Sequence, residues 1–165
     1  MHRVTRSVSI AAATVAIALL AQQSAADAKE VPSAMMASIY AFANGDATAN
    51  AAQLKAACMP NATIIDEFAP YQWSGAGSAE RYAADVKAFF KASDLTDVHV
   101  AIEDPRYWDA KGDSAWVSVP ATFWFVMGGK HATESGEFTF VLTKINDAWK
   151  VKTSAWTTTS LAFEH

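Results

Sequence analysis

Four long segments in the second half of the chain are rich in β-branched and aromatic residues, which is typical of strands. They cover residues 97–104, 114–127, 132–145 and 148–163. Between successive segments stand dipeptides that favour tight turns: Gly112-Asp113, Gly128-Gly129 and Asn146-Asp147. Turns this short join antiparallel neighbours, so the sequence predicts a four-stranded antiparallel meander. Pro120 has no backbone N–H and therefore predicts a bulge or an edge within the second strand.

The region before residue 93 has helical character. Apolar residues recur at helical spacing over residues 34–43, 47–58 and 78–92, with a short β-branched strand at Thr63-Ile64-Ile65. Asn44-Gly45-Asp46 predicts the end of the first helix, and Ser78 predicts the N-cap of the third. Helices followed by consecutive strands, with no repeat or linker, predict one α+β domain.

The first 28 residues resemble a secretory signal peptide rather than part of the fold. Arg3 and Arg6 precede an uncharged apolar run, and Ala26-Asp27-Ala28 fits a cleavage site. The alternative is an uncleaved anchor, but the run is shorter than the ~20 residues of a membrane-spanning helix. We therefore expect export to the periplasm or the medium, cleavage near Lys29, one domain over residues 29–165, and no membrane association after cleavage.

Composition and motifs exclude several classes of function. The net charge is −4 and no basic patch is present, so nucleic acid is not an expected partner. Cys58 is the single cysteine and is expected to be a buried small hydrophobe. His99 and His131 fall on different strands without ligand spacing, which predicts no metal site. No phosphate-binding or nucleophile-elbow motif occurs, so no cofactor is expected.

The stretch around Asp66 raises the main functional question. Two isoleucines precede this acid, and Phe68, Tyr71 and Trp73 follow it. One interpretation is an Asp that caps a turn after a short strand. The other is a pocket carboxylate whose pKa is raised by apolar surroundings, which suits a general base.

The order of several motifs resembles the nuclear transport factor 2-like superfamily, in particular its SnoaL-like and ketosteroid-isomerase-like groups. These motifs are a helix ending "ANGD", a second helix, "NATIID", "WSG" before a third helix, and strands ending "AWKVKTSAW". The resemblance covers residues 31–161. It implies a cone-shaped α+β barrel, in which a curved antiparallel sheet wraps around three N-terminal helices and encloses an apolar pocket. Superfamily members include isomerases, dehydratases, cyclases, hydrolases, carriers and interaction modules.

The resemblance also suggests individual site residues. "ATIIDEF" matches the ketosteroid isomerase motif A-T-V-E-D-P-F, which places Asp66 on the proton-shuttling Asp. The family's catalytic Tyr corresponds to about Ser38, with Tyr40 two residues further on. Its protonated Asp corresponds to about Phe138, and the adjacent Glu137 points to the other face if the strand is regular. One of the three catalytic groups therefore matches, and steroid isomerisation itself is not expected. We expect Asp66 as base and Tyr40 as donor if the protein is an enzyme.

Ligand-contacting residues are expected around the same pocket. The expected residues are Phe68, Tyr71, Trp73, Phe90 and Glu137. Aromatic side chains with a polar group suit a flat, partly apolar ligand. Core packing is the alternative for Tyr40, and packing under the third helix is favoured for Trp73.

Trp116 and Trp124 lie eight residues apart on one predicted strand and therefore on one face. The opposite face carries Val117, Val119, Ala121, Phe123 and Phe125 and is expected to be buried. The tryptophan face is expected to form a homodimer interface, with ligand stacking as the alternative.

Three functions follow from the sequence. The first is a protein that binds a small hydrophobic or aromatic molecule. The second is a cofactor-independent isomerase, dehydratase or cyclase that uses Asp66. The third is a dimeric scaffold whose working surface is the tryptophan-bearing sheet face.

Overall fold

The computed structural model describes residues 30–164, so the predicted signal peptide lies outside the described residues. The helices are α2 (Ser33–Ala47), α3 (Ala51–Ala57) and α4 (Ser78–Ala92). The strands are β1 (Cys58–Ile65), β2 (Gln72–Trp73), β3 (Leu95–Ile102), β4 (Tyr107–Lys111), β5 (Ser114–Met127), β6 (Lys130–Ile145) and β7 (Ala148–Phe163). Among the helices of this part of the chain, none has both the length and the apolar character that a membrane span requires.

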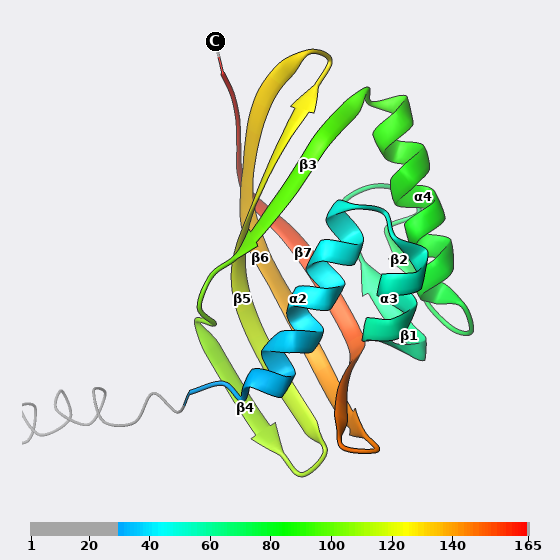
Figure 1. Ribbon diagram of the computed structural model, residues 1–165, viewed down its shortest axis with the longest axis vertical. Coiled ribbons are helices and arrows are strands. Elements are labelled where there is room, and N and C mark those ends of the chain that lie inside the picture. Colours follow the sequence, from blue (N-terminus) through cyan, green and yellow to red (C-terminus); the bar gives the residue numbers. More distant parts are fainter. Residues whose placement is uncertain (1–29, 165) are drawn as a thin grey trace, which may run out of the picture. The chain divides into compact units, whose positions relative to one another are not determined.

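The seven strands form one curved sheet in the order β2-β1-β7-β6-β5-β3, with β4 also paired to β5 (Figure 1). The predicted order of strands is confirmed, since antiparallel pairing joins β3 to β5, β5 to β6 and β6 to β7. The turn at Gly112-Asp113, however, joins β5 to β4, a strand that the sequence did not predict. The sheet is not antiparallel throughout, because β1 pairs in parallel with β7. It also stays unclosed, with β2 and β3 at its two ends.

Pro120 lies in the interior strand β5, at the point where the neighbouring strand of β5 changes from β3 to β4. Register between β5 and β6 is continuous across Pro120, so the predicted bulge does not occur on that side. On the other side β3 ends at Ile102 and β4 starts at Tyr107. The Pro120 carbonyl accepts from the Glu103 N–H where the chain passes between these strands. An N–H and a C=O of one residue point to the same neighbour in an antiparallel ladder, so Pro120 faces the connection between β3 and β4 and is neither at a bulge nor at a free edge.

Helix α2 presents a buried stripe to the sheet, at the spacing that one helix face requires. Its buried members include Met35, Ile39, Phe42, Ala43 and Asp46. The predicted end at Asn44-Gly45-Asp46 is wrong, since the helix continues to Ala47. Gly45 serves close packing instead of capping, because a Cβ there would lie 3.0 Å from the Cγ of Leu54 in α3.

Ser78 is the first residue of α4 and not its N-cap, which corrects the sequence-based expectation. Gly77 takes the N-cap position in a left-handed conformation, with φ of 70°. The buried Ser78 hydroxyl donates to the Ala62 carbonyl at 2.7 Å. This bond joins the start of α4 to β1, so both segments that flank the loop of residues 66–77 are held together.

The inner face of the sheet forms an aromatic core with α2. Phe42 makes edge-to-face contacts with Phe138 and Phe140, at centroid distances of 6.0 and 5.5 Å. Gly136 lies on the same face of β6, and a Cβ there would come within 2.4 Å of Trp156 Cζ2. The missing side chain therefore makes room for the Trp156 ring, which packs against Phe138 and Phe123.

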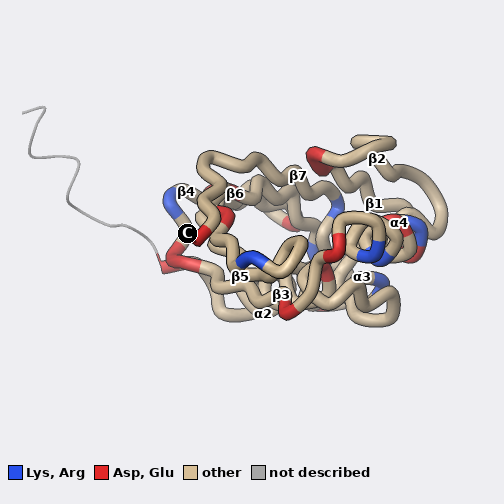
Figure 2. The backbone as a smooth tube through the Cα atoms, turned by 90° about the horizontal axis from the view of Figure 1, so that it is seen from above, with Lys and Arg blue, Asp and Glu red and all other residues tan. Residues whose placement is uncertain are grey.

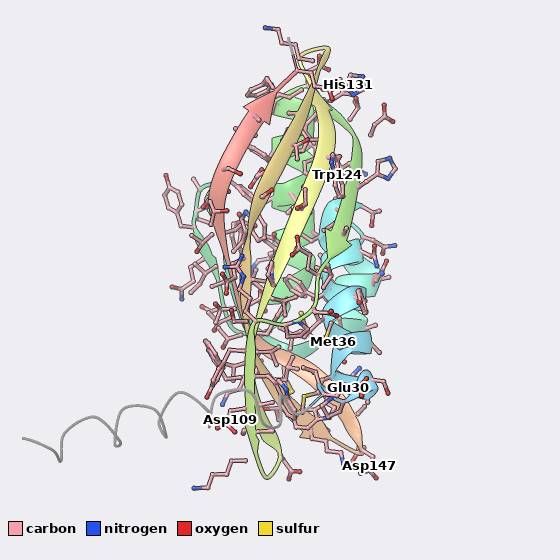
Figure 3. The ribbon with its side chains drawn as sticks, turned by 90° about the vertical axis from the view of Figure 1, so that its left-hand side faces the viewer. Glu30, Met36, Asp109, Trp124, His131 and Asp147 are labelled. Carbon is pink, nitrogen blue, oxygen red and sulfur yellow. The ribbon has the colours of Figure 1, made fainter. Side chains whose placement is uncertain are left out.

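The outer face of the sheet carries exposed tryptophans, as expected from the alternation along β5. Trp116 and Trp124 are 40% and 44% exposed, while Val117, Val119, Ala121, Phe123 and Phe125 are buried. Figure 3 views the sheet from this side and labels Trp124. The exposed Tyr107 of β4 contacts the Trp116 ring at a centroid distance of 5.1 Å. The residues Tyr107, Trp116 and Trp124 are called the outer aromatic patch below.

Candidate functional site

A cavity of about 220 Å³ opens between the inner face of the sheet and helices α2 and α4. Its walls are mostly apolar and come from α4, β3, β5 and β7. The apolar lining residues are Ala47, Phe68, Val86, Phe89, Phe90, Leu95, Val98, Phe123, Phe125 and Trp156. The polar lining residues are Asp46, Asp66, Glu67, Tyr82 and Glu134. An apolar chamber with a small set of polar groups is the usual form of a small-molecule site.

The Tyr82 hydroxyl joins two carboxyl groups at the inner part of this cavity. Its oxygen lies 2.7 Å from Asp46 Oδ1 and 2.5 Å from Asp66 Oδ2. The three residues come from the last turn of α2, the end of β1 and the first half of α4. The second oxygen of Asp66 accepts the N–H of Glu67 at 2.6 Å.

This arrangement requires one proton more than the tyrosine supplies. A hydroxyl carries a single hydrogen and can donate to only one carboxylate. The second short contact therefore needs a hydrogen on a carboxyl group. Asp46 is the more deeply buried acid, with 8% of its surface exposed, so it holds this proton and donates to the Tyr82 oxygen. Tyr82 then donates to the Asp66 carboxylate.

The electrostatics of the three groups agree with this assignment. Burial, together with the Asp66 charge, raises the pKa of Asp46 from its ordinary 3.8 to about 8. Burial also raises the pKa of Asp66, while the Tyr82 hydroxyl and the Glu67 N–H act in the opposite direction. Burial and the two neighbouring acids raise the pKa of Tyr82 well above 10, so it remains a neutral donor.

A second hydroxyl also lies between two carboxyl groups, at another part of the cavity wall. Thr158 Oγ1 lies 2.6 Å from Glu67 Oε2 and 2.5 Å from Glu134 Oε1. Glu67 Oε1 accepts the N–H of Thr158 at 2.6 Å, and Glu134 Oε1 accepts the indole N–H of Trp156 at 2.9 Å. Glu67 thereby ties the loop after β1 to β7, which holds the neighbouring Asp66 against the cavity.

Three of the residues expected from the sequence line the cavity. Asp66 does so with its carboxylate on Tyr82, so its surroundings are those of a pocket as well as a strand end. Phe68 stacks on Phe89 with a centroid distance of 5.0 Å, and Phe90 lies on the same helix. Whether these residues act on a ligand stays a prediction.

Four of the expected residues are not among those that line the cavity. Tyr40 is 44% exposed because it falls beside the buried stripe of α2, and Tyr71 is 60% exposed on the loop after β1. Trp73 is buried under α4 and donates its indole N–H to Asp85 at 2.7 Å, as the favoured alternative predicted. Glu137 lies on the outer face of β6, where it accepts from Ser118 and pairs with Arg106.

Sequence reasoning missed Asp46, Tyr82 and the inward position of Glu134 in the site. The sequence predicts Asp46 at a helix end, although its spacing of four residues from Phe42 places it on the buried stripe. Tyr82 carried only a core-packing signal. Glu134 is four residues from Phe138 on one strand, so both share the inner face. For Asp46 and Glu134, the available signal was a polar residue that falls at the spacing of the buried positions.

Outside the cavity, residue types that often carry chemistry do not cluster within the part of the chain that the structure describes. Burial raises the pKa of the Cys58 thiol to about 12, so it remains a protonated thiol. Within residues 30–164, no three His, Cys, Asp or Glu side chains are arranged to hold a metal ion.

The fold and this cavity place the chain in a class of cone-shaped α+β proteins. Residues 31–155 match the model of the SnoaL-like domain, and the chain therefore belongs to this family. A comparison with curated protein sequences found no match.

Solved structures in the nuclear transport factor 2-like superfamily share the fold. A hexachlorocyclohexane dehydrochlorinase (LinA) matches with a TM-score of 0.67 at 10% identity, over 90% of this chain and 93% of that chain. A ketosteroid isomerase-like protein from Erwinia carotovora atroseptica matches with a TM-score of 0.61 at 14% identity, over 78% and 95%. A superfamily protein from Salmonella enterica serovar Typhimurium matches with a TM-score of 0.60 at 14% identity, over 74% and 87%.

The raised pKa of Asp46 predicts a pH-dependent stability. A carboxyl whose folded pKa is raised contributes stability that is fully present below its unfolded pKa of 3.8 and is lost as the pH rises through about 8. We expect the free energy of unfolding to fall over this pH window, because the folded state keeps about one proton on Asp46 that the unfolded state releases. Asp46→Asn mimics the neutral acid and should remove that contribution, as measured by urea unfolding at a series of pH values. An unchanged slope in the variant would contradict the assignment.

Proposed function

We propose that this SnoaL-like protein is an exported binding protein for a small aromatic or apolar molecule, which its cavity encloses. Export rests on the signal-like residues 1–28. The observation that carries the binding function is the cavity itself, which has aromatic walls and a few carboxyl groups toward its inner part. A cavity of 150 Å³ in another protein holds benzene, so about 220 Å³ suits one ring with a short substituent.

The hydrogen bonds of Asp66 support a binding role in preference to proton abstraction. One oxygen accepts from Tyr82 and the other accepts from the Glu67 N–H. Hydrogen bonds to the charged form stabilise it and make it a weaker base. A carboxylate held in this way is well suited to orient a polar group of a ligand.

Val98 provides a test of the binding site, because it lines the cavity and is only partly buried. Val98→Phe should fill the chamber and weaken binding of toluene and benzyl alcohol at least tenfold, as measured by NMR titration. Val141→Phe is the matched control, since Val141 lies on the outer face of β6, opposite Trp116 of β5. Equal affinities in the wild type and the Val98 variant would show that these probes do not bind in the cavity.

A second candidate function is proton transfer by Asp66, which two observations favour. Burial raises the pKa of Asp66, and raised carboxyl pKa values are frequent in general bases. The similar structures include a dehydrochlorinase and an isomerase-like protein. In this reading Tyr82 and Asp46 hold the base in place, and Asp66 accepts a proton from carbon.

Acetophenone is a suitable probe for this second candidate, because it is a single-ring ketone with exchangeable methyl protons. If Asp66 is a base, the protein accelerates exchange of these protons with D₂O, and Asp66→Asn reduces the rate by about 10²–10⁴-fold. Proton NMR measures the exchange. Tyr40→Phe is the control and should have no effect, since Tyr40 is outside the cavity. Exchange no faster than in buffer would rule out the catalytic reading for this probe and leave the binding function.

We also propose that the outer aromatic patch forms a homodimer interface, as expected from the sequence. Three aromatic side chains are exposed on neighbouring strands of this face, and exposed aromatic side chains commonly mark contacts. Light scattering after gel filtration should give a dimer mass for the wild type and a monomer mass for Trp124→Ala. Tyr71→Ala, which removes an exposed aromatic from a loop, should remain dimeric. A monomeric wild type would contradict the proposal.

A further inference from the structure

We propose that the ligand of the cavity is a single-ring aromatic amine that binds in its protonated form, with the ammonium group among Asp46, Asp66 and Glu134 and the ring between the aromatic walls. This inference rests on the proposed binding function and specifies the chemical class of its ligand.

The charges around the cavity are of one sign. Four carboxyl groups line it, those of Asp46, Asp66, Glu67 and Glu134. None of the described lining residues is Lys, Arg or His. The described Lys and Arg residues, blue in Figure 2, include several on α4 and β7, but none of them lines the cavity. A ligand carboxylate or phosphate would therefore be repelled without a compensating cation, whereas a cation would be attracted.

The hydrogen-bonding capacity of the cavity points in the same direction. Its side-chain donors are already engaged, because Tyr82 donates within the aspartate cluster and the Trp156 indole N–H donates to Glu134. Acceptors remain available. Asp46 is more than nine-tenths buried and lines the cavity, and its Oδ2 accepts no hydrogen bond from the described residues. An ammonium group has three N–H donors and no acceptor, which matches this arrangement.

The apolar walls suit the remainder of such a ligand. Phe68 and Phe89 on one side and Phe123 and Trp156 on the other present aromatic surface to the cavity. Aromatic rings attract cations through their quadrupole, so they favour an organic ammonium as well as its ring. The volume limits the ligand to about one ring and a short side chain.

The proposed ligand class also predicts how the affinity depends on pH. Asp46 faces Tyr82 from α4, Asp66 from the end of β1 and Glu134 from β6. An ammonium placed among these groups favours the ionised form of Asp46. Binding of the amine should therefore tighten as the pH rises from about 6 to about 8, whereas binding of an uncharged analogue should not.

The experiment compares three probes that differ only in their polar group: benzylamine, benzyl alcohol and benzoate. Isothermal titration calorimetry or NMR titration on the wild-type protein gives the dissociation constants at several pH values. We expect benzylamine to bind at least tenfold more tightly than benzyl alcohol, and benzoate to bind most weakly.

Two glutamates on β6 supply a matched pair of variants. Glu134→Gln removes a carboxylate from the cavity, and Glu137→Gln removes one from the outer face of the same strand. The first should reduce the preference for the amine over the alcohol several-fold, with the alcohol still bound. The second should leave the preference unchanged. Asp66→Asn gives an independent reading if Glu134→Gln does not fold.

The outcomes separate this inference from the function on which it rests. Benzyl alcohol bound as tightly as benzylamine, or benzoate bound more tightly, would overturn the amine assignment and leave the binding function intact. An amine preference that both glutamate variants retain equally would place the amine outside the cavity and overturn the assignment. No binding of any probe would contradict both proposals.

Discussion

The hydroxyl of Tyr82 is the contact on which the arrangement of the site depends. It joins the last turn of α2, the end of β1 and helix α4, three segments that are far apart in the sequence. Each of the three groups would be costly to bury alone, because an unpaired polar group loses its bonds to water. Together they satisfy one another with one carboxyl proton retained. The same bonds that make burial tolerable therefore place two acids at the wall of an aromatic cavity.

The two faces of the sheet show how one strand pattern separates two roles. On β6, Phe138, Phe140 and Glu134 point inward, while Glu137 points outward to Ser118 and Arg106. Inward-facing side chains line the cavity or the core, and outward-facing side chains form the exposed surface of the sheet. The absent side chain of Gly136 adds a local adjustment, because it allows the Trp156 ring to lie close to β6. Two glutamates three residues apart thus belong to different surfaces of the molecule.

Fold membership narrows the function only to a class. The chain belongs to the SnoaL-like family, and structural neighbours at 10–14% identity share its fold. The chemistry depends on side chains that differ between members. Here the distinguishing set is a tyrosine between two aspartates, a threonine between two glutamates, and no cation among the described lining residues. Carboxyl groups and aromatic side chains line the same cavity, and this combination is the physical basis for both functional proposals.

The sequence by itself determined the three helices and the four long strands, because periodicity and turn chemistry are local. The strands β2 and β4 were not predicted, and the curved sheet around the helices followed from the family resemblance. The three helices, the meander of β3, β5, β6 and β7 and the two faces of β5 follow from spacing alone. Asp66 could be found from the acid among apolar residues and from the family motif. The parallel pairing of β1 with β7 and the contacts among Asp46, Asp66 and Tyr82 could not, because they join residues that are distant in the chain. The positions of Tyr40 and Tyr71 could not be predicted either, because the rotation of a helix and the path of a loop are decided by packing against other elements. Alternation along β6, by contrast, is local and places Glu137 on the face opposite Phe138.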